Sequence, residues 1–223
     1  MKRVMIGIFA HPDDGTFGPG GTFALAAQNG FETHMICATC GDAGINDKGH
    51  DDLATVREAE EREAGEILGI SSHVMLRLGD GQLCNNAYLP TAERLLYHLR
   101  DLTTPEDDVT LVTFAPDGLT GHLDHIFMSL VTTYCYLKLR GERRLQLKYF
   151  VIPAAWNPTA NTDWLYMPKG RDASDIDEII DVRAVRDQKV AAIRAHRTQT
   201  KDADTHLSRG DELFDEHFTF YKD

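Results

Sequence analysis

The chain has 223 residues, of which 42% are hydrophobic and 26% are charged, a composition typical of a globular protein with one sizeable core. The formal net charge of -12, without any run of Lys or Arg, argues against a nucleic-acid partner. No apolar run approaches the roughly 18 residues of a membrane span, and no cleavage-site pattern follows the short apolar N-terminus. We therefore expect one domain over residues 1–223, located in the cytoplasm, without a nucleic-acid or membrane partner.

Apolar runs alternate with helix-like segments along the whole chain, which is typical of an α/β fold with a mostly parallel sheet. Short β-branched runs predict strands, and amphipathic segments that end at Gly predict helices. In chain order we expect a strand over 4–9, a helix over 17–29, a strand over 34–39, a helix over 51–68, a strand over 74–78, a helix over 90–102, a strand over 109–114, a helix over 122–139, a strand over 147–152 and a helix over 182–196.

The helix expected over 51–68 is rich in Glu, Arg and Ala, which favour helices. Its apolar positions predict a buried face made of Val56, Ala59, Ala64 and Ile67. Further along, the segment 153–172 contains two Trp and three Pro among polar residues. This composition predicts a long surface loop, and long loops in compact domains often carry function.

Two histidine-containing motifs follow strands of the expected sheet. The sequence AHPDD at 10–14 comes directly after the first strand, and HLDH at 122–125 comes after the loop that follows the strand over 109–114. Ligands of α/β sheets bind at the carboxyl ends of the strands. Catalytic zinc takes imidazole nitrogen and carboxylate oxygen from three protein ligands and keeps a position for water. Because residues 122 and 125 are three apart, a helix would present both imidazoles on one side.

The histidine motifs and the glycines beside them also allow interpretations other than a metal site. A His-Pro or Asp-Asp pair alone is common in solvated turns, but the two motifs have complementary donors and both follow strands. The glycines at 15, 18, 20 and 21 lack the dinucleotide-binding spacing, and no Gly-Lys-Ser/Thr follows them, which disfavours a nucleotide-binding oxidoreductase. Six further histidines have no comparable motif around them. We expect three of them in or beside the core, namely His34, His73 and His98. We expect the other three to be exposed, namely His50, His206 and His217.

At this point the chain resembles the LmbE-like or PIG-L-type N-acetylglucosaminyl deacetylases, a family that includes the deacetylases of mycothiol and bacillithiol synthesis. The resemblance covers most of the chain and implies a Rossmann-like fold, with a mostly parallel sheet flanked by helices. Besides the two histidine motifs, the matching segments in chain order are Gly20-Gly21-Thr22, Thr39-x-Gly41-Asp42-x-Gly44, Arg57-x-x-Glu60 with Leu68-Gly69, Leu78-x-Asp80-Gly81 and His196-Arg197-Thr198-Gln199.

The resemblance also implies the cofactor. One zinc ion per chain would be bound by His11, Asp14 and His125, with Fe²⁺ or another divalent metal as the alternative. This ligand set agrees with the preference of zinc for imidazole and carboxylate donors. The partner implied is a small amino-sugar molecule, and the sequence leaves open whether the chain forms a homo-oligomer.

The same resemblance implies the catalytic roles. Asp13 would be the general base for the metal-bound water, His122 would stabilise or protonate the tetrahedral intermediate, and Asp124 would orient an imidazole. The chemistry is consistent with these roles, because a metal-activated water needs only a neighbouring carboxylate as base. The tetrahedral oxyanion also needs a donor besides the metal, which His122 could provide.

Substrate binding is assigned by the resemblance to Arg57 and Asp42. The alternative for Arg57 is a helix-surface ion pair with Glu60 or Glu61. His196 and Gln199 match a late element of the family that we expect to be structural or to line the pocket. The chain departs from the family at Gly15 and Asp42, where the family usually has Glu, so the substrate is less defined than the reaction.

The expected function is therefore the removal of an N-acetyl group from an N-acetylglucosamine-type sugar by a metal-dependent hydrolase. One alternative is a metal hydrolase of another small amide or ester, which would share the site but differ in the pocket. A second alternative is a non-catalytic metal-binding module of the same fold. The presence of both Asp13 and His122 beside a complete ligand set argues against the second alternative, since a binding module needs neither a base nor an acid.

Overall fold

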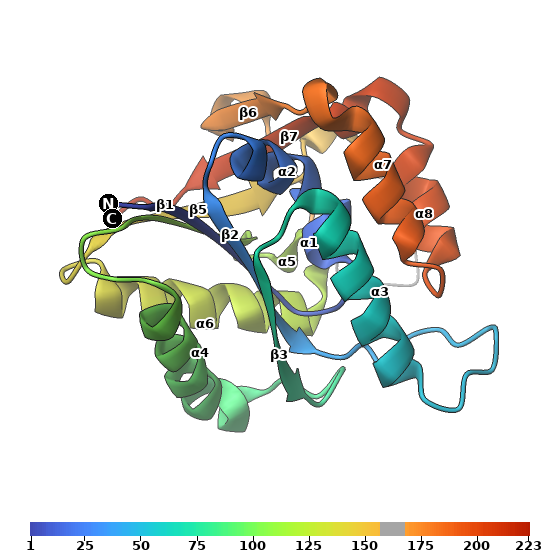
Figure 1. The fold of residues 1–223 in the computed structure, drawn as a ribbon, viewed down its shortest axis with the longest axis horizontal. Helices are drawn as coiled ribbons and strands as arrows, with labels where there is room; N and C mark the ends of the chain where they lie inside the picture. Colours follow the sequence, from blue (N-terminus) through green and yellow to red (C-terminus); the bar gives the residue numbers. More distant parts are fainter. Residues whose placement is uncertain (157–167) are drawn as a thin grey trace.

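The computed structural model describes residues 1–156 and 168–223, which are arranged around a seven-stranded sheet (Figure 1). The strand order is β3-β2-β1-β4-β5-β7-β6. The first five strands along the chain pair in parallel, and β7 is antiparallel to both β5 and β6. This sheet confirms the predicted α/β, Rossmann-like class.

Five of the seven strands lie where the apolar runs predicted them. The remaining two, β6 and β7, were missed, because β6 is short with alternating exposure and β7 carries charged residues. The bounds are β1 Arg3–Phe9, β2 Glu32–Thr39, β3 Ser72–Leu78, β4 Asp108–Phe114, β5 Arg144–Val151, β6 Glu178–Asp181 and β7 Asp215–Phe220.

The helices agree with the prediction except near residue 18 and after residue 196. The helix expected over 17–29 is confirmed as α2 but begins later, at Gly20, after a break at Gly18-Pro19; the short α1 before the break and α8 were not predicted. The bounds are α1 Asp14–Phe17, α2 Gly20–Gln28, α3 Leu53–Leu68, α4 Tyr88–Leu102, α5 Gly118–Gly121, α6 Leu123–Leu139, α7 Arg186–Ala195 and α8 Thr200–Leu207. Short 3-10 turns occupy η1 Asn85–Ala87, η2 Ala154–Trp156, η3 Ala173–Asp175, η4 Arg183–Val185 and η5 Gly210–Phe214.

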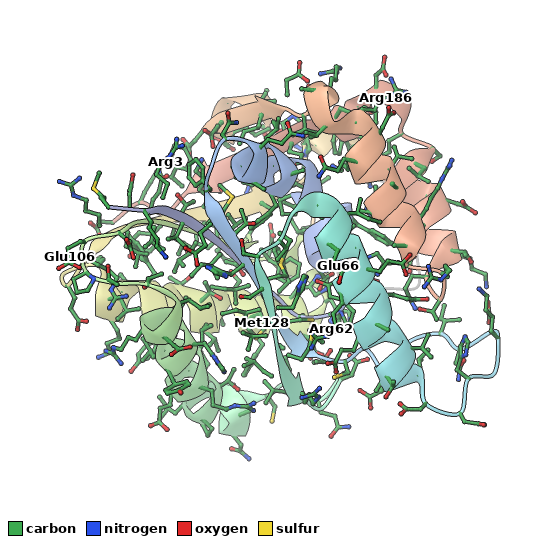
Figure 2. The ribbon with its side chains drawn as sticks, in the orientation of Figure 1. Arg3, Arg62, Glu66, Glu106, Met128 and Arg186 are labelled. Carbon is green, nitrogen blue, oxygen red and sulfur yellow. The ribbon has the colours of Figure 1, made fainter. Side chains whose placement is uncertain are left out.

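Helices cover both faces of the sheet (Figure 1). Helices α4 and α6 pack together on one face, and α2, α3 and α7 form the layer on the other. The sheet and these layers enclose the core, in which Met128 of α6 is completely buried, whereas Arg3, Glu106 and Arg186 extend outward (Figure 2). Among the described helices, none is long and apolar enough to cross a bilayer.

The buried face of α3 differs from the predicted one. Ala64 is buried as expected, but Ala59 is exposed, and the buried positions include the charged side chains of Arg57, Glu60 and Glu61. An apolar pattern could not indicate this face, because the charged groups are stabilised by polar partners from other segments rather than by apolar contacts. Of the loop predicted over 153–172, residues 157–167 lie outside the described part.

Candidate metal centre and active site

The residues of the two histidine motifs meet at the carboxyl end of the sheet. His11 follows β1, and Asp14 is the first residue of α1. His122 caps the N-terminus of α6, so that His125 lies in its first turn. Between His11 and Asp14, the backbone of Asp13 has a φ of 120°. A non-glycine residue in this region is strained, and such strain is concentrated at functional sites.

The donor atoms of three candidate ligand residues lie close together. His11 Nδ1 is 3.2 Å from His125 Nε2, and Asp14 places its carboxylate oxygens 3.4 Å from His11 Nδ1 and 3.3 Å from His125 Nε2. Ligand atoms bound at ~2.0–2.1 Å to a tetrahedral zinc ion are about 3.3 Å apart. The separations are of this size, with Asp14 Oδ2 facing His11 and Asp14 Oδ1 facing His125, so the three residues can together supply ligands to a divalent ion.

Two other groups of donors lie near His11 but fit a metal less well. His11 also approaches His122 together with His125, and Asp80 together with Asp124, with ligand atoms within 4.8 Å. The Asp124 carboxylate, however, accepts backbone N–H groups of Gly81 and Leu83 at 2.8 and 3.3 Å. We favour the set with Asp14, because its carboxylate lies between the two histidines and its Oδ1 faces His125 Nε2 at 3.3 Å, while its Oδ2 accepts the backbone N–H of His11 at 2.7 Å.

The two ligand imidazoles are oriented through their remaining nitrogens. His125 Nδ1 is 3.0 Å from the Gly118 carbonyl oxygen, so an Nδ1–H donor leaves the Nε2 lone pair facing Asp14. The ring also stacks on Phe114, with centroids 4.1 Å apart. On His11, Nε2 lies 3.1 Å from Asp80 Oδ1 and 3.4 Å from Asp124 Oδ2. Such outer contacts set the tautomer and orientation of ligating histidines.

The charges around His11 favour a cation. Burial lowers the pKa of His11, but hydrogen bonds to Asp124, Asp14 and Asp80 outweigh it and raise this pKa to about 12. Burial would also raise the pKa of Asp14, yet the neighbouring His125 and His11 hold it well below its usual range. Carboxylates thus lie at both ring nitrogens of His11, and either a proton or a metal ion on this ring can balance their negative charge.

Asp13 is a buried carboxylate held by an arginine. Its Oδ2 accepts a hydrogen bond from Arg57 Nη2 at 2.9 Å, and its backbone N–H donates to Glu61 Oε2 at 3.1 Å. Burial raises the pKa of Asp13, whereas the positive charge of Arg57 acts to lower it. The balance leaves a carboxyl group with a higher proton affinity than an exposed aspartate, which suits a base.

Arg57 lies inside the protein rather than on the helix surface. Its side chain is 4% exposed and also donates to the carbonyl oxygens of Pro12 and Gly41, at 2.7 and 2.9 Å. The alternative of a surface ion pair with Glu60 or Glu61 is therefore wrong. Gly41 packs so closely that an added Cβ would lie 2.4 Å from the guanidinium carbon, which explains why glycine stands in this motif.

His122 lies against both ligand imidazoles. Its ring centroid is 4.7 Å from that of His11 and 4.8 Å from that of His125, onto which it stacks. Its Nδ1 accepts the backbone N–H of Asp124 at 3.2 Å. Burial lowers the pKa of His122, and the nearby His125 and His11 lower it further.

Two cavities meet at these residues, and both are lined by Asp13 and His122. The first, which we call the polar cavity, has a volume of about 450 Å³ and is further lined by His11, Arg57, Asp80 and Gln199. The second, which we call the aromatic cavity, has a volume of about 250 Å³ and is bounded by the rings of Phe17, Phe114, Phe150 and Trp156. Asp42 is exposed and lines neither of them.

Comparison with known proteins identifies the family. The family model described as "PIG-L: GlcNAc-PI de-N-acetylase" matches residues 6–136. The chain belongs to the PIG-L family. It is 30% identical to a 1D-myo-inositol 2-acetamido-2-deoxy-alpha-D-glucopyranoside deacetylase from Saccharomonospora viridis, with 87% of this chain and 84% of the relative covered. The resemblance noted in the sequence is thereby confirmed, and the name of this relative agrees with the predicted enzyme class.

Solved structures share the fold of this PIG-L protein. An N,N'-diacetylchitobiose deacetylase from Pyrococcus horikoshii has a TM-score of 0.72 at 19% identity, with 98% of this chain and 84% of that chain covered. A 4-carboxy-2-hydroxymuconate hydratase from Pseudomonas putida has a TM-score of 0.75 at 21% identity, with 100% and 97% covered. Because the two proteins differ in reaction, the fold alone does not determine the chemistry.

Several residues of this PIG-L site were not assigned from the sequence. Asp80 stands in a matching segment but received no role, although it contacts His11. Glu61 looked like one more helix-surface acid, yet it is 3% exposed and binds the Asp13 backbone. None of the three histidines expected to be exposed is fully so: His217 is 8% exposed within β7, and His50 and His206 are half-buried, the latter beside the aromatic cavity.

The late segment 196–199 is joined to α3. Glu60 accepts hydrogen bonds from the backbone N–H and the hydroxyl of Thr198, at 3.0 and 2.6 Å. His196 is 1% exposed, and burial lowers its pKa to about 3. Gln199 lines the polar cavity. These contacts agree with the expected structural or pocket-lining role of this segment.

Proposed function

We propose that this PIG-L protein is a divalent-metal hydrolase that removes the N-acetyl group from an N-acetylglucosamine-type sugar. The observation that carries the proposal is the arrangement of His11, Asp14 and His125: the two imidazole nitrogens are 3.2 Å apart, and one Asp14 oxygen lies 3.4 Å from the first and the other 3.3 Å from the second. Asp13 and His122 stand beside this set and face both cavities. The family membership and the deacetylase name of the similar protein support the choice of an amino sugar.

His11, Asp14 and His125 would hold the metal ion, with zinc as our first choice and Fe²⁺ as the alternative. When bound, the ion supplies a Lewis acid that polarises the amide carbonyl and acidifies a water molecule. Asp80 and Asp124 contribute by orienting His11 through its Nε2. These residues prepare the site before the substrate arrives, because their contacts are independent of it.

Asp13 accepts the proton of the attacking water. Arg57 holds Oδ2, and in this proposal Oδ1 is the proton acceptor. A carboxylate whose pKa is raised by burial accepts a proton more readily than an exposed one, and it can transfer that proton onward to the leaving amine. In this arrangement Arg57 is a positioning residue, since it donates hydrogen bonds to Asp13 Oδ2 and to the backbone carbonyl oxygens of Pro12 and Gly41.

His122 donates a hydrogen bond to the tetrahedral oxyanion, or a proton to the departing nitrogen. Its ring contacts with His11 and His125 support this role, because they put His122 beside the proposed metal ligands. Because its pKa is lowered, its protonated form is a stronger acid than an exposed imidazolium. Donors fixed in advance stabilise developing charge more strongly than mobile water does.

The sugar would occupy the polar cavity. Asp80 and Gln199 face this space, and Asp80 Oδ2 also accepts the backbone N–H of Ala43 at 2.8 Å. Carboxylates and amides are suitable partners for sugar hydroxyl groups. Asp42, for which we predicted a substrate contact, lies outside both cavities, and we assign it no contact with the sugar ring in this proposal.

We expect purified protein to contain about one divalent metal ion per chain and to release free amine from N-acetylglucosamine derivatives. The experiment combines elemental analysis with amine detection, before and after removal of the metal by a chelator. Restoration of activity by added zinc is the expected result. Metal-free protein with full activity would contradict the proposal, and activity confined to esters or other small amides would favour the alternative hydrolase.

A further inference from the structure

The aromatic cavity extends well beyond the space that an acetyl group needs. It is lined by Asp14 and His125 of the metal centre and by Arg209 and Leu213 of the C-terminal segment, and it has a volume of about 250 Å³. A methyl group is about as large as a water molecule, whose share of the liquid volume is roughly 30 Å³. The cavity can therefore hold a substituent several times larger than the methyl of an acetyl group.

Arg209 contributes a positive charge to the wall of this cavity. Its guanidinium lies over the Trp156 ring, 5.0 Å from the centroid. Burial lowers the pKa of Arg209, and the nearby Glu212 acts in the opposite direction without forming an ion pair. Within residues 1–156 and 168–223, no hydrogen bond or ion pair engages its guanidinium. A partly desolvated cation of this kind gains from an anionic partner.

Three other charges along the cavity already have partners. Lys189 is paired with Glu216 at 2.6 Å, and Asp215 is paired with Arg183 at 2.6 Å. Burial lowers the pKa of His206 to about 4, so this ring is neutral near pH 7.

The acids nearest the metal centre do not reach Arg209. Asp13 is paired with Arg57, and Asp14 contacts the ligand histidines. Asp202 is exposed and lines both cavities, which places it where they meet, whereas Arg209 lines only the aromatic one. Arg209 is therefore a cation of the aromatic cavity that has no hydrogen-bond or ion-pair partner among the described residues.

We propose that Arg209 binds an anionic group of the substrate, a carboxylate or a phosphate, at the end of an apolar substituent that lies along Phe17, Phe150 and Trp156. A guanidinium binds such groups through two parallel charge-assisted hydrogen bonds. The inference rests on the proposed deacetylase function and narrows its substrate class. The anion can belong to the acyl group or to the aglycone, because the carbon bearing the amide neighbours the anomeric carbon of the sugar.

The test uses two matched pairs of glucosamine derivatives. One pair, N-butyryl and N-succinyl glucosamine, differs by a carboxylate at the end of the acyl group. The other pair, the methyl and carboxymethyl glycosides of N-acetylglucosamine, differs by a carboxylate on the aglycone. Amine release is measured for each with the wild type, Arg209→Gln, Arg209→Lys and the exposed control Arg194→Gln.

We expect the wild type to prefer the anionic member of one pair, and that pair identifies the source of the anion. Arg209→Gln should lower the ratio of kcat/KM for the anionic to the neutral member by about 10- to 100-fold, mainly through KM, as expected for a hydrogen-bonded charge. Arg209→Lys should retain part of the preference, since it keeps the charge but loses the planar fork. Arg194→Gln should leave the ratio unchanged.

The inference is overturned if the wild type shows no preference for either anionic member, or if the ratio is the same in Arg209→Gln as in the wild type. Should Arg209→Gln fail to fold, the ratio measured for Arg209→Lys decides in its place, and an unchanged ratio there counts against the inference. Failure of the proposed function is a different result, because then none of the four compounds releases amine with the wild type.

Discussion

Asp13 and Asp14 are neighbours with the same side chain, but the structure places them differently. Asp14 contacts both ligand histidines, whereas Asp13 faces Arg57 and both cavities. Replacing Asp13 by Asn keeps the shape of the side chain and an oxygen that can accept from Arg57, but it removes the proton acceptor. Replacing Asp14 by Ala removes a carboxylate from the proposed ligand set.

The expected magnitudes follow from these contacts. Asp13→Asn should retain about one metal ion per chain, because His11, Asp14 and His125 are unchanged, and kcat should fall by roughly 10²–10⁴-fold, the usual contribution of general acid–base catalysis. Asp14→Ala should lose the metal and activity together, since two histidines alone do not complete a catalytic site. The acidic limb of the pH–rate profile should change or vanish in Asp13→Asn if it reports this carboxylate.

The assay measures metal content, kcat and thermal unfolding on the same preparations of the two variants. Unfolding is included because Arg57 is buried, and loss of its charged partner could destabilise the protein by itself. If Asp13→Asn loses the metal and Asp14→Ala retains it, the two roles are reversed. If both variants keep metal and activity, this motif is not the catalytic centre.

Two further predictions concern buried groups. Arg57→Ala should lower kcat more than it raises KM, because it leaves Asp13 without the charge that orients it and opposes the burial-induced rise of its pKa; a change confined to KM would instead indicate direct contact with the sugar. His196 has a folded-state pKa of about 3, below the ordinary 6.5, so the unfolded chain binds the extra proton. Its contribution to stability is present above pH 6.5 and is lost as pH falls toward 3. Denaturant unfolding of His196→Gln should show a weaker loss over that window, and an identical pH dependence would contradict this assignment.

The fold could be predicted because its signals are local. Strands β1 to β5 are mostly short apolar runs, and their burial on both faces reflects the helices that cover a parallel sheet. Strands β6 and β7 carry no such signal. In β7, Glu216 is buried because its carboxylate accepts the backbone N–H groups of Gly21 and Thr22 at 2.8 Å and pairs with Lys189. Partners this distant in sequence cannot be inferred from a hydrophobic pattern.

The candidate metal ligands were accessible to sequence reasoning for a similar reason. Histidine and aspartate directly after a strand must lie at the carboxyl edge of the sheet, wherever the rest of the chain goes. The separations among His11, Asp14 and His125 were not accessible, since His11 and His125 are 114 positions apart and their distance depends on how β1 and α6 are packed.

The tertiary structure alone decided which charged residues are buried and what they contact. Arg57 lies 44 positions from Asp13 in the chain, and by its spacing it was equally compatible with a surface pair on α3. Arg209 had no sequence signal at all, because its importance comes from the absence of a partner among the described residues and from the ring of Trp156 beneath it. Burial of a charge is a property of packed neighbours, and the order of residues in one segment does not specify it.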